Sequence, residues 1–173
     1  MRIIDRQPVY DGFFKVYKLT IEDEGETYER EVFETGQAVA ALVFDTRKKK
    51  FIFVEQFRSA VNQYLVELPA GLLDKEGESP EDALSREVTE ETGYAVDRLE
   101  HILNFYPSPG AFAERLQIFY AEVSHKTGEG GGAHGENEKI RIIELNPNEV
   151  KKKHFVDAKT LIAVQWAQLK GLL

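Results

Sequence analysis

The sequence of 173 residues predicts an α/β domain in which helices cover a mixed β-sheet, with an antiparallel hairpin added at the N-terminus. Three observations favour this class. Short β-rich runs are interleaved with two or three helical segments along the chain. One helical segment carries both a start and a stop signal. Near the N-terminus, two β-rich runs flank a short polar turn that contains a glycine, which is typical of a hairpin.

The hairpin is formed by the runs FFKVYKLTI, residues 13–21, and TYEREVFE, residues 27–34. Between them lies the polar turn EDEGE, residues 22–26. Both runs are rich in β-branched and aromatic residues, which favour strands. We therefore expect residues 1–36 to form a hairpin that stands before the main sheet.

The next runs predict the centre of the main sheet. AVAALVFD, residues 38–45, is almost continuously apolar, which is typical of a strand buried on both faces. FIFVEQF, residues 51–57, follows after the polar turn TRKKK. YLVELPAG, residues 64–71, is a further strand, which we expect to end at Pro69 because proline cannot donate a ladder hydrogen bond.

A helix is expected at about residues 80–92. Ser79 is a favourable N-cap, and Pro80 suits the first helical position. Acidic residues fill the first turn, where they interact well with the helix dipole. Gly93 is suited to the left-handed conformation that commonly follows a helix C-terminus.

The C-terminal half predicts more strands and two more helices. Strands are expected at about 101–106, 116–123 and 140–145, then a short helix from Asn146-Pro147, then an apolar helix capped by Asp157. No internal repeat or domain boundary is evident, so residues 1–173 are expected to form one domain. Its catalytic part would span residues 37–173, after the N-terminal hairpin.

The segment SHKTGEGGGAHGENE, residues 124–138, fits no regular element. Long loops within compact domains are usually either functional or disordered. One interpretation is a flexible surface loop. The other is a mobile lid that carries Glu136 and Glu138 to a site.

Composition excludes some functions and disfavours others. The net charge of −8 argues against nucleic acid as a partner, because phosphate backbones are bound by basic patches. The absence of cysteine excludes thiolate catalysis and cysteine-based zinc sites. Neither a signal peptide nor a membrane-spanning run is evident, so we expect a cytoplasmic protein that does not bind membranes.

The predicted acidic helix presents three carboxylates on one arc. At about 100° per residue, Glu90 and Glu91 lie within about 60° of Glu87, on either side of it. Like charges at this spacing repel one another unless something offsets them. Mg²⁺ prefers oxygen ligands and would do so. Composition alone leaves two interpretations open, a metal site and a solvated acidic face.

The spacing of these residues resembles the Nudix box. Glu78, the pair Arg86-Glu87, the pair Glu90-Glu91 and Gly93 stand where the box has its fixed residue types. Between Gly71 and Glu78 the chain has one residue more than is usual in the box. The carboxylate spacing is unchanged by this difference. The resemblance implies the Nudix α/β/α sandwich and hydrolysis at a diphosphate.

Other blocks resemble one branch of this family, the ADP-ribose pyrophosphatases and nucleoside diphosphate sugar hydrolases. These blocks are VYDGFF, VEQFRSA, ELPAGL, SPGAFAE, GENEKIR and TLIAVQWAQL, and together they cover nearly the whole chain. GDP-mannose hydrolases share the layout, including a glycine-rich loop that ends in an acidic run. The resemblance therefore implies the branch but leaves the nucleotide open.

The resemblance also implies roles for individual residues. The implied metal ligands are Glu87, Glu90, Glu91, Glu138 and the carbonyl of Ala70. The implied catalytic set is Glu136 as general base together with Glu87, Glu91 and Arg86, the last braced by Glu78. The implied substrate contacts are Arg58 at the diphosphate, Glu114 at the terminal sugar, Gly110 in the SPGAFAE block, and Arg30 at the nucleotide of another subunit.

The implied reaction is Mg²⁺-dependent hydrolysis, with Mn²⁺ able to substitute. ADP-ribose would give AMP and ribose 5-phosphate, and GDP-mannose would give GMP and mannose 1-phosphate. The implied assembly is a homodimer with exchanged N-terminal strands. Two alternatives stay open: a Nudix-like module that binds a nucleotide without hydrolysing it, and an Arg58 that merely pairs with Glu55 or Glu67.

Overall fold

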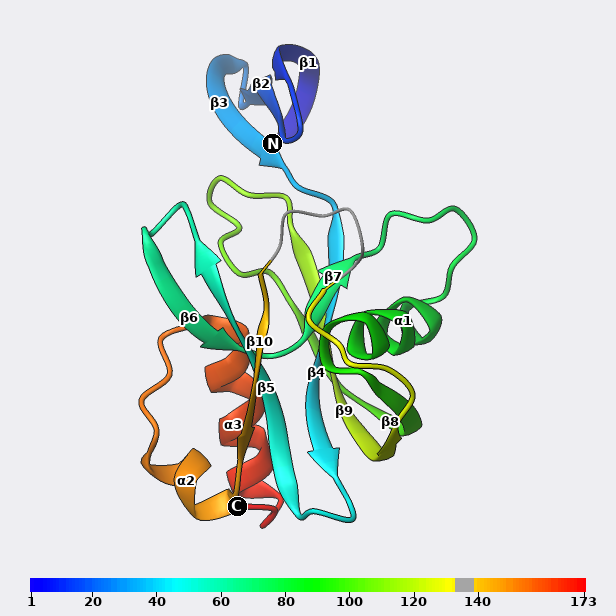
Figure 1. Ribbon diagram of the computed structural model, residues 1–173. Coiled ribbons are helices and arrows are strands. Elements are labelled where there is room, and N and C mark those ends of the chain that lie inside the picture. Colours follow the sequence, from blue (N-terminus) through cyan, green and yellow to red (C-terminus); the bar gives the residue numbers. More distant parts are fainter. Residues whose placement is uncertain (133–138) are drawn as a thin grey trace.

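The computed structural model describes residues 1–132 and 139–173 and contains two β-sheets. The smaller sheet is formed by the N-terminal residues. The larger sheet is mixed and lies between helices, as Figure 1 shows. No helix among the described residues is long and apolar enough to cross a membrane.

The N-terminal sheet has three antiparallel strands in the order β1 (Arg2–Asp11), β2 (Lys15–Asp23) and β3 (Glu26–Glu34). Strands β2 and β3 are the predicted hairpin. The sequence did not predict β1, because Pro8 interrupts its pattern. Pro8 is tolerated because β1 is an edge strand, and its register shifts between Pro8 and Tyr10.

The large sheet has the strand order β10-β5-β4-β9-β8, with β6 paired to β5 and β7 paired to β4. Its strands are β4 (Gln37–Asp45), β5 (Lys50–Arg58), β6 (Gln63–Glu67), β7 (Ala70–Leu72), β8 (Tyr94–Phe105), β9 (Arg115–Lys126) and β10 (Arg141–Leu145). Strands β4 and β9 are parallel, and the other recorded pairs are antiparallel. The predicted strand at 64–71 is divided into β6 and β7 at Leu68-Pro69.

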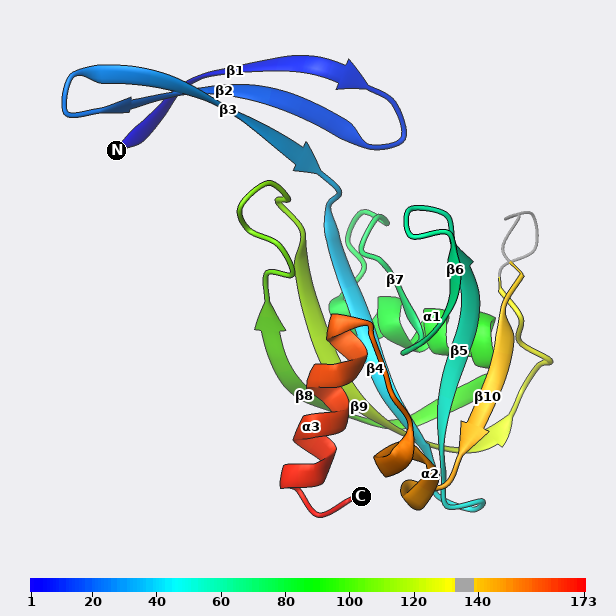
Figure 2. The same ribbon diagram turned by 90° about the vertical axis from the view of Figure 1, so that its left-hand side faces the viewer.

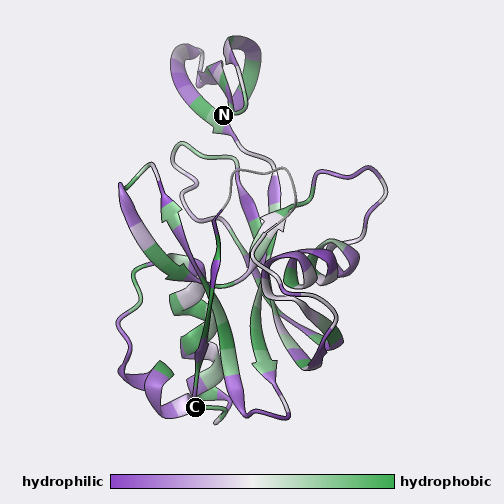
Figure 3. Cartoon of the chain, viewed as in Figure 1, coloured by the Kyte–Doolittle hydropathy of each residue, from purple (hydrophilic) through white to green (hydrophobic). Residues whose placement is uncertain are grey.

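Helices cover both faces of this sheet, so the predicted sandwich is confirmed. Helix α1 (Pro80–Thr92) packs on one face and α3 (Ala158–Leu169) on the other, while α2 (Pro147–Lys152) is short (Figure 2). Alternate residues of β4 serve the two faces: Val39 and Ala41 pack with Leu84 of α1, whereas Ala40 and Leu42 belong to the cluster that includes α3. Figure 3 shows hydrophobic colouring along β4 and β5 and hydrophilic colouring along α1.

The ends of α1 agree with the capping signals. The Ser79 hydroxyl accepts a hydrogen bond from the Asp82 amide, and Gly93 adopts the left-handed conformation with φ of 76°. The apolar composition of α3 did not indicate how much of the helix is buried. Only one side of α3 is buried, and Leu169 is 90% exposed.

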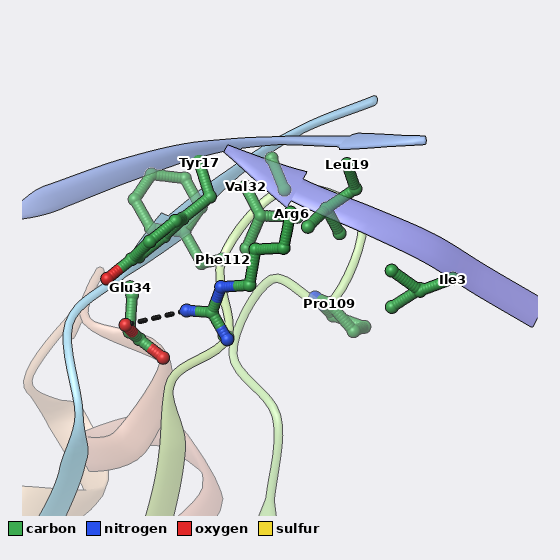
Figure 4. A pocket seen from close by; sticks show the side chains of 10 residues that line it. Ile3, Arg6, Tyr17, Leu19, Val32, Glu34, Pro109 and Phe112 are labelled. Atoms are coloured by element: carbon green, nitrogen blue, oxygen red, sulfur yellow. Dashed lines mark hydrogen bonds and ion pairs between the residues drawn. The ribbon is translucent and has the colours of Figure 1, made fainter. Parts of the chain in front are cut away.

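The N-terminal sheet stands away from the sandwich and meets it at one place (Figures 1 and 2). There, the amide of Phe33 donates to the carbonyl of Ala111 at 2.8 Å, and the rings of Phe33 and Phe112 stack with centroids 5.1 Å apart. A cavity of about 300 Å³ lies under the sheet beside this contact. Figure 4 shows its apolar lining and the ion pair of Arg6 with Glu34, whose atoms lie 2.8 Å apart.

Candidate active site

Arg86 links Glu78, which precedes α1, to the acidic residues of the helix. Its Nε and Nη2 atoms donate to the two carboxylate oxygens of Glu78 at 3.1 and 3.2 Å, which forms a fork. The remaining nitrogen, Nη1, donates to Glu87 at 2.6 Å and to Glu90 at 3.2 Å. The hydrogen bond from Arg86 lowers the pKa of Glu78, and the same bond raises the pKa of Arg86. The predicted brace between Glu78 and Arg86 is therefore present.

Glu91 fixes α1 to the short strand β7. Its side chain is buried, at 4% exposed, and its Oε2 atom accepts a hydrogen bond from the Ala70 amide at 3.1 Å. Next to Ala70, Gly71 lies so close to Glu87 that a Cβ atom at this position would overlap the carboxylate. The extra residue between Gly71 and Glu78 therefore does not displace Gly71 from α1. It is accommodated in the turn before the helix, where Gly77 adopts a φ of 79°.

The acidic residues of α1 fit a divalent cation in their chemistry. All the nearby donors are oxygens, which hard cations such as Mg²⁺ and Mn²⁺ prefer, and the absent Cβ of Gly71 leaves room for the Glu87 carboxylate against β7. Within residues 1–132 and 139–173, no three histidine, aspartate or glutamate side chains converge as metal ligands. Here the guanidinium of Arg86 offsets the charge of Glu87 and Glu90. Nη1 makes these two hydrogen bonds, whereas Nε and Nη2 form the fork to Glu78.

Arg58 lies at the end of β5 and pairs with a buried carboxylate. Its Nε and Nη2 atoms donate to the two carboxylate oxygens of Glu67, each at 2.8 Å. Glu67 also accepts from Lys159 of α3. The ion pair with Glu67 that the sequence allowed is thus present, while 39% of the Arg58 side chain is exposed. Substrate contact by Arg58 is compatible with this arrangement.

The other predicted substrate residues lie near the N-terminal sheet. Arg30 is on β3, where its guanidinium lies over the Tyr28 ring, 4.6 Å from its centroid. Gly110 is exposed in the turn that leads to the Phe33 contact, and Glu114 directly precedes β9. These three residues thus lie on β3 and on the segment before β9, whereas the acidic residues lie on α1.

The two remaining predicted residues lie outside the described residues: Glu136 and Glu138. The residues that precede that segment follow β9 in the chain and lie against the C-terminal end of α1. The amides of Gly131 and Gly132 donate to the carbonyl oxygens of Glu91 and Glu90 at 2.8 and 3.1 Å. The glycine-rich segment is therefore tied to the backbone of two predicted metal ligands.

Sequence reasoning missed Lys159 and the second role of Asp157. Asp157 was predicted only as a helix cap, which it is, but it also accepts a hydrogen bond from Lys159 at 3.0 Å. The sequence contained one signal for the contact between Lys159 and an acidic residue. A cation in the first turn of a helix is unfavourable with respect to the helix dipole, so Lys159 needs an acidic partner.

Comparison with known proteins agrees with this geometry. The chain is similar to the methanol dehydrogenase activator of Bacillus methanolicus, at 35% identity over 99% of this chain and 95% of that one. It is 36% identical to the ADP-ribose pyrophosphatase of Bacillus subtilis (strain 168), over 99% of this chain and 95% of the relative. It is 35% identical to the GDP-mannose pyrophosphatase of Cronobacter sakazakii, over 91% of this chain and 87% of the relative.

The fold also matches a solved structure described as an ADP compounds hydrolase. The TM-score is 0.81 at 20% identity, over 99% of this chain and 96% of that one. Residues 34–164 match the model of the NUDIX domain family. With the acidic helix, its arginine brace and the strand β7 in place, the chain belongs to the Nudix family of hydrolases.

Proposed function

We propose that this protein hydrolyses the diphosphate linkage of nucleoside diphosphate sugars. ADP-ribose would give AMP and ribose 5-phosphate, and GDP-mannose would give GMP and mannose 1-phosphate. The observation that carries the proposal is the acidic face of α1, where Arg86 braces Glu78 and Glu91 is hydrogen-bonded to the Ala70 amide. The names of relatives at 35–36% identity over most of the chain support this substrate class.

Nudix hydrolases generally use a divalent metal ion. We propose Mg²⁺, replaceable by Mn²⁺, held by Glu87, Glu90, Glu91, Glu138 and the carbonyl of Ala70. When bound, the ion would neutralise the diphosphate and lower the pKa of a bound water. The buried hydrogen bond between Glu91 and Ala70 would orient Glu91 before any substrate arrives.

The other roles in this proposal belong to residues of the chain itself. Glu136 would accept the proton of the attacking water as general base. Arg58 would bind the diphosphate, since a guanidinium is well suited to phosphate oxygens. Glu114 would contact the terminal sugar, and Gly110 would be a further substrate contact. Lack of nucleic-acid binding and a cytoplasmic location stay predictions from composition.

We further propose a homodimer with exchanged N-terminal strands, in which residues 1–36 serve dimerisation and residues 37–173 catalysis. All ten residues of β1 are exposed in the single chain, which leaves the outer edge of the N-terminal sheet uncovered. Exposed large apolar side chains gather there: Ile3, Ile4, Val9, Tyr10, Phe13 and Phe14. Such patches favour a protein partner. Pairing of two chains would carry Arg30 to the nucleotide of the other subunit. Sedimentation at micromolar concentration measures the mass of the particle in solution, and a strictly monomeric mass would count against this role of Arg30.

The catalytic proposal is tested by product analysis. The native protein and Glu91→Gln are incubated with Mg²⁺ and either ADP-ribose or GDP-mannose, and released AMP or GMP is quantified by chromatography. We expect release by the native protein and a loss of at least about a hundredfold in Glu91→Gln, as is common when a group that stabilises the transition state is removed. A native protein that binds the substrates without releasing a nucleotide would overturn the proposal.

A second candidate has its own support. The relative named as an activator of methanol dehydrogenase is matched over 99% of this chain, and that name describes an effect on another enzyme. A nucleotide-binding regulatory module would therefore also fit. The same assay separates the two candidates, because a purely regulatory module would release no AMP or GMP.

A further inference from the structure

Four charged side chains form a cluster between the large sheet and α3. We call it the Glu67 cluster; its members are Arg58, Glu67, Asp157 and Lys159. Glu67 is at the centre and only 2% of its side chain is exposed. It accepts the fork from Arg58 on one side and the ammonium of Lys159 on the other. Two cations and two carboxylates make the cluster neutral.

The cluster is anchored firmly on the α3 side. The side chain of Lys159 is 11% exposed and also bonds to Asp157. Asp157 caps α3 through the amide of Thr160 at 3.0 Å and accepts the Thr160 hydroxyl hydrogen at 2.6 Å. The same hydroxyl oxygen accepts the Leu68 amide at 3.0 Å. The strand end that carries Glu67 is therefore held to α3 by two independent contacts.

Arg58 is the one member of the cluster that faces outward. Its side chain is 39% exposed, whereas those of Glu67, Lys159 and Asp157 are 2%, 11% and 17% exposed. The fork engages Nε and Nη2 and thereby fixes the plane of the guanidinium. Because the long side chain of arginine otherwise loses much rotamer freedom on binding, a fixed plane lowers the cost of binding an anion.

The cluster also continues directly into the candidate active site. Glu67 is the last residue of β6, and Leu68-Pro69 connects it to Ala70, whose amide donates to Glu91. The Pro69 carbonyl accepts the amide of Ala41 in the central strand β4 at 3.0 Å. The segment that sets the place of Glu67 thus also sets the place of Ala70.

Stability alone does not account for the cluster. Taking several charges out of water is costly, and apolar side chains of similar volume often replace a buried ion pair without loss of stability. Burial raises the pKa of Glu67, but the Arg58 hydrogen bond and the Lys159 charge outweigh it and leave that pKa lowered. Glu67 is therefore ionised at neutral pH.

We propose that Glu67 is a positioning residue: it holds the Arg58 guanidinium in one orientation for an oxyanion of the substrate, and Lys159 fixes Glu67 to α3. The substrate group concerned is a phosphate of a nucleoside diphosphate. This inference rests on the proposed function, because it assigns Arg58 to the diphosphate.

A double-mutant cycle tests the inference. The native protein, Arg58→Ala, Glu67→Gln and the double variant are compared by the dissociation constant for ADP-ribose and for GDP-mannose, measured calorimetrically, and by kcat and KM with Mg²⁺. We expect each single change to weaken binding and to lower kcat/KM about tenfold, mainly through KM, as for coupled neighbouring groups. In the Arg58→Ala background, Glu67→Gln should cost less than about twofold more.

Two further variants keep the test decisive. Glu144→Gln is the matched control, because Glu144 also pairs with lysines but does so at the opposite end of β5. It should leave binding and KM unchanged. Glu67→Asp keeps the charge but shortens the side chain, and it replaces Glu67→Gln in the cycle if that variant does not fold.

Two results would overturn the inference: multiplicative effects of the two changes, or a Glu67 variant that lowers the melting temperature without changing binding or KM. A native protein that binds but does not hydrolyse refutes the proposed function, while the cycle in dissociation constants still decides the inference. A native protein that does not bind either nucleotide sugar refutes both.

Discussion

Gly130→Ala should destabilise the protein because two separate costs coincide at this position. Gly130 has φ of 75°, which costs a residue with a side chain about 1–2 kcal/mol. A Cβ atom would also lie 2.7 Å from the Glu91 carbonyl oxygen and 2.6 Å from the carbonyl carbon of Thr92. These are backbone atoms at the end of α1, so they cannot move away as a flexible side chain could.

The magnitude follows from the hydrogen bonds next to Gly130. Moving the loop away from α1 would break the bonds that the amides of Gly131 and Gly132 make to Glu91 and Glu90, about 1 kcal/mol each. With the backbone cost, the loss of unfolding free energy is about 3–4 kcal/mol. For a chain of this size that corresponds to a fall in melting temperature of roughly 10 °C.

Two other glycines separate the two costs. Gly25 has φ of 88°, and a Cβ atom added there would meet no other atom within 4 Å, so Gly25→Ala should lose only about 1–2 kcal/mol. Gly128 has open space and no positive φ, so Gly128→Ala should change stability by less than about 0.5 kcal/mol. Thermal and urea unfolding of the three variants measure these differences. If Gly130→Ala proved no less stable than Gly25→Ala, the contact with α1 would have no energetic weight.

Three further outcomes are expected. Gly71→Ala should lower nucleotide release at least about tenfold, because its Cβ displaces the Glu87 carboxylate. It should shift the melting temperature little, since the Glu87 side chain can move; a large fall in melting temperature, or unchanged nucleotide release, would contradict this. The free energy of unfolding should fall as pH drops below about 4.5, because folding lowers the pKa values of Glu67 and Glu144 from 4.5. Urea unfolding at pH 7, 5 and 3 measures this fall, and an unchanged free energy of unfolding would refute the prediction. Chelation by EDTA should abolish nucleotide release and excess Mg²⁺ should restore it; release that persists in EDTA would refute the metal proposal.

The sequence predicted best those features that depend on residues close together in the chain. The limits of α1 follow from Ser79 and Gly93, whose cap geometries depend on neighbouring residues only. The burial of β4 on both faces follows from its continuous apolar run. The Nudix assignment likewise came from a short pattern with fixed spacing, and the family comparison confirmed it. Fold class and family were therefore within reach of the sequence.

Contacts between distant segments were harder to predict. Lys159 and Glu67 are 92 residues apart, and no periodic pattern relates a helix start to a strand end across that distance. The contacts of Arg86 with both Glu87 and Glu90 depend on a side-chain choice that spacing leaves open. Strand β1 was missed because it is stabilised by pairing with β2, whereas its own sequence, interrupted by Pro8, lacks a clear strand pattern.

The apolar core has a consequence for how the protein can change over evolutionary time. Among the described residues, neither hydrophobic cluster includes a position before Ala38. Substitutions in the first 36 residues therefore leave the burial that stabilises the sandwich intact. In the proposed dimer, subunit pairing and the Arg30 contact could therefore diverge between relatives while the buried core of the sandwich is kept.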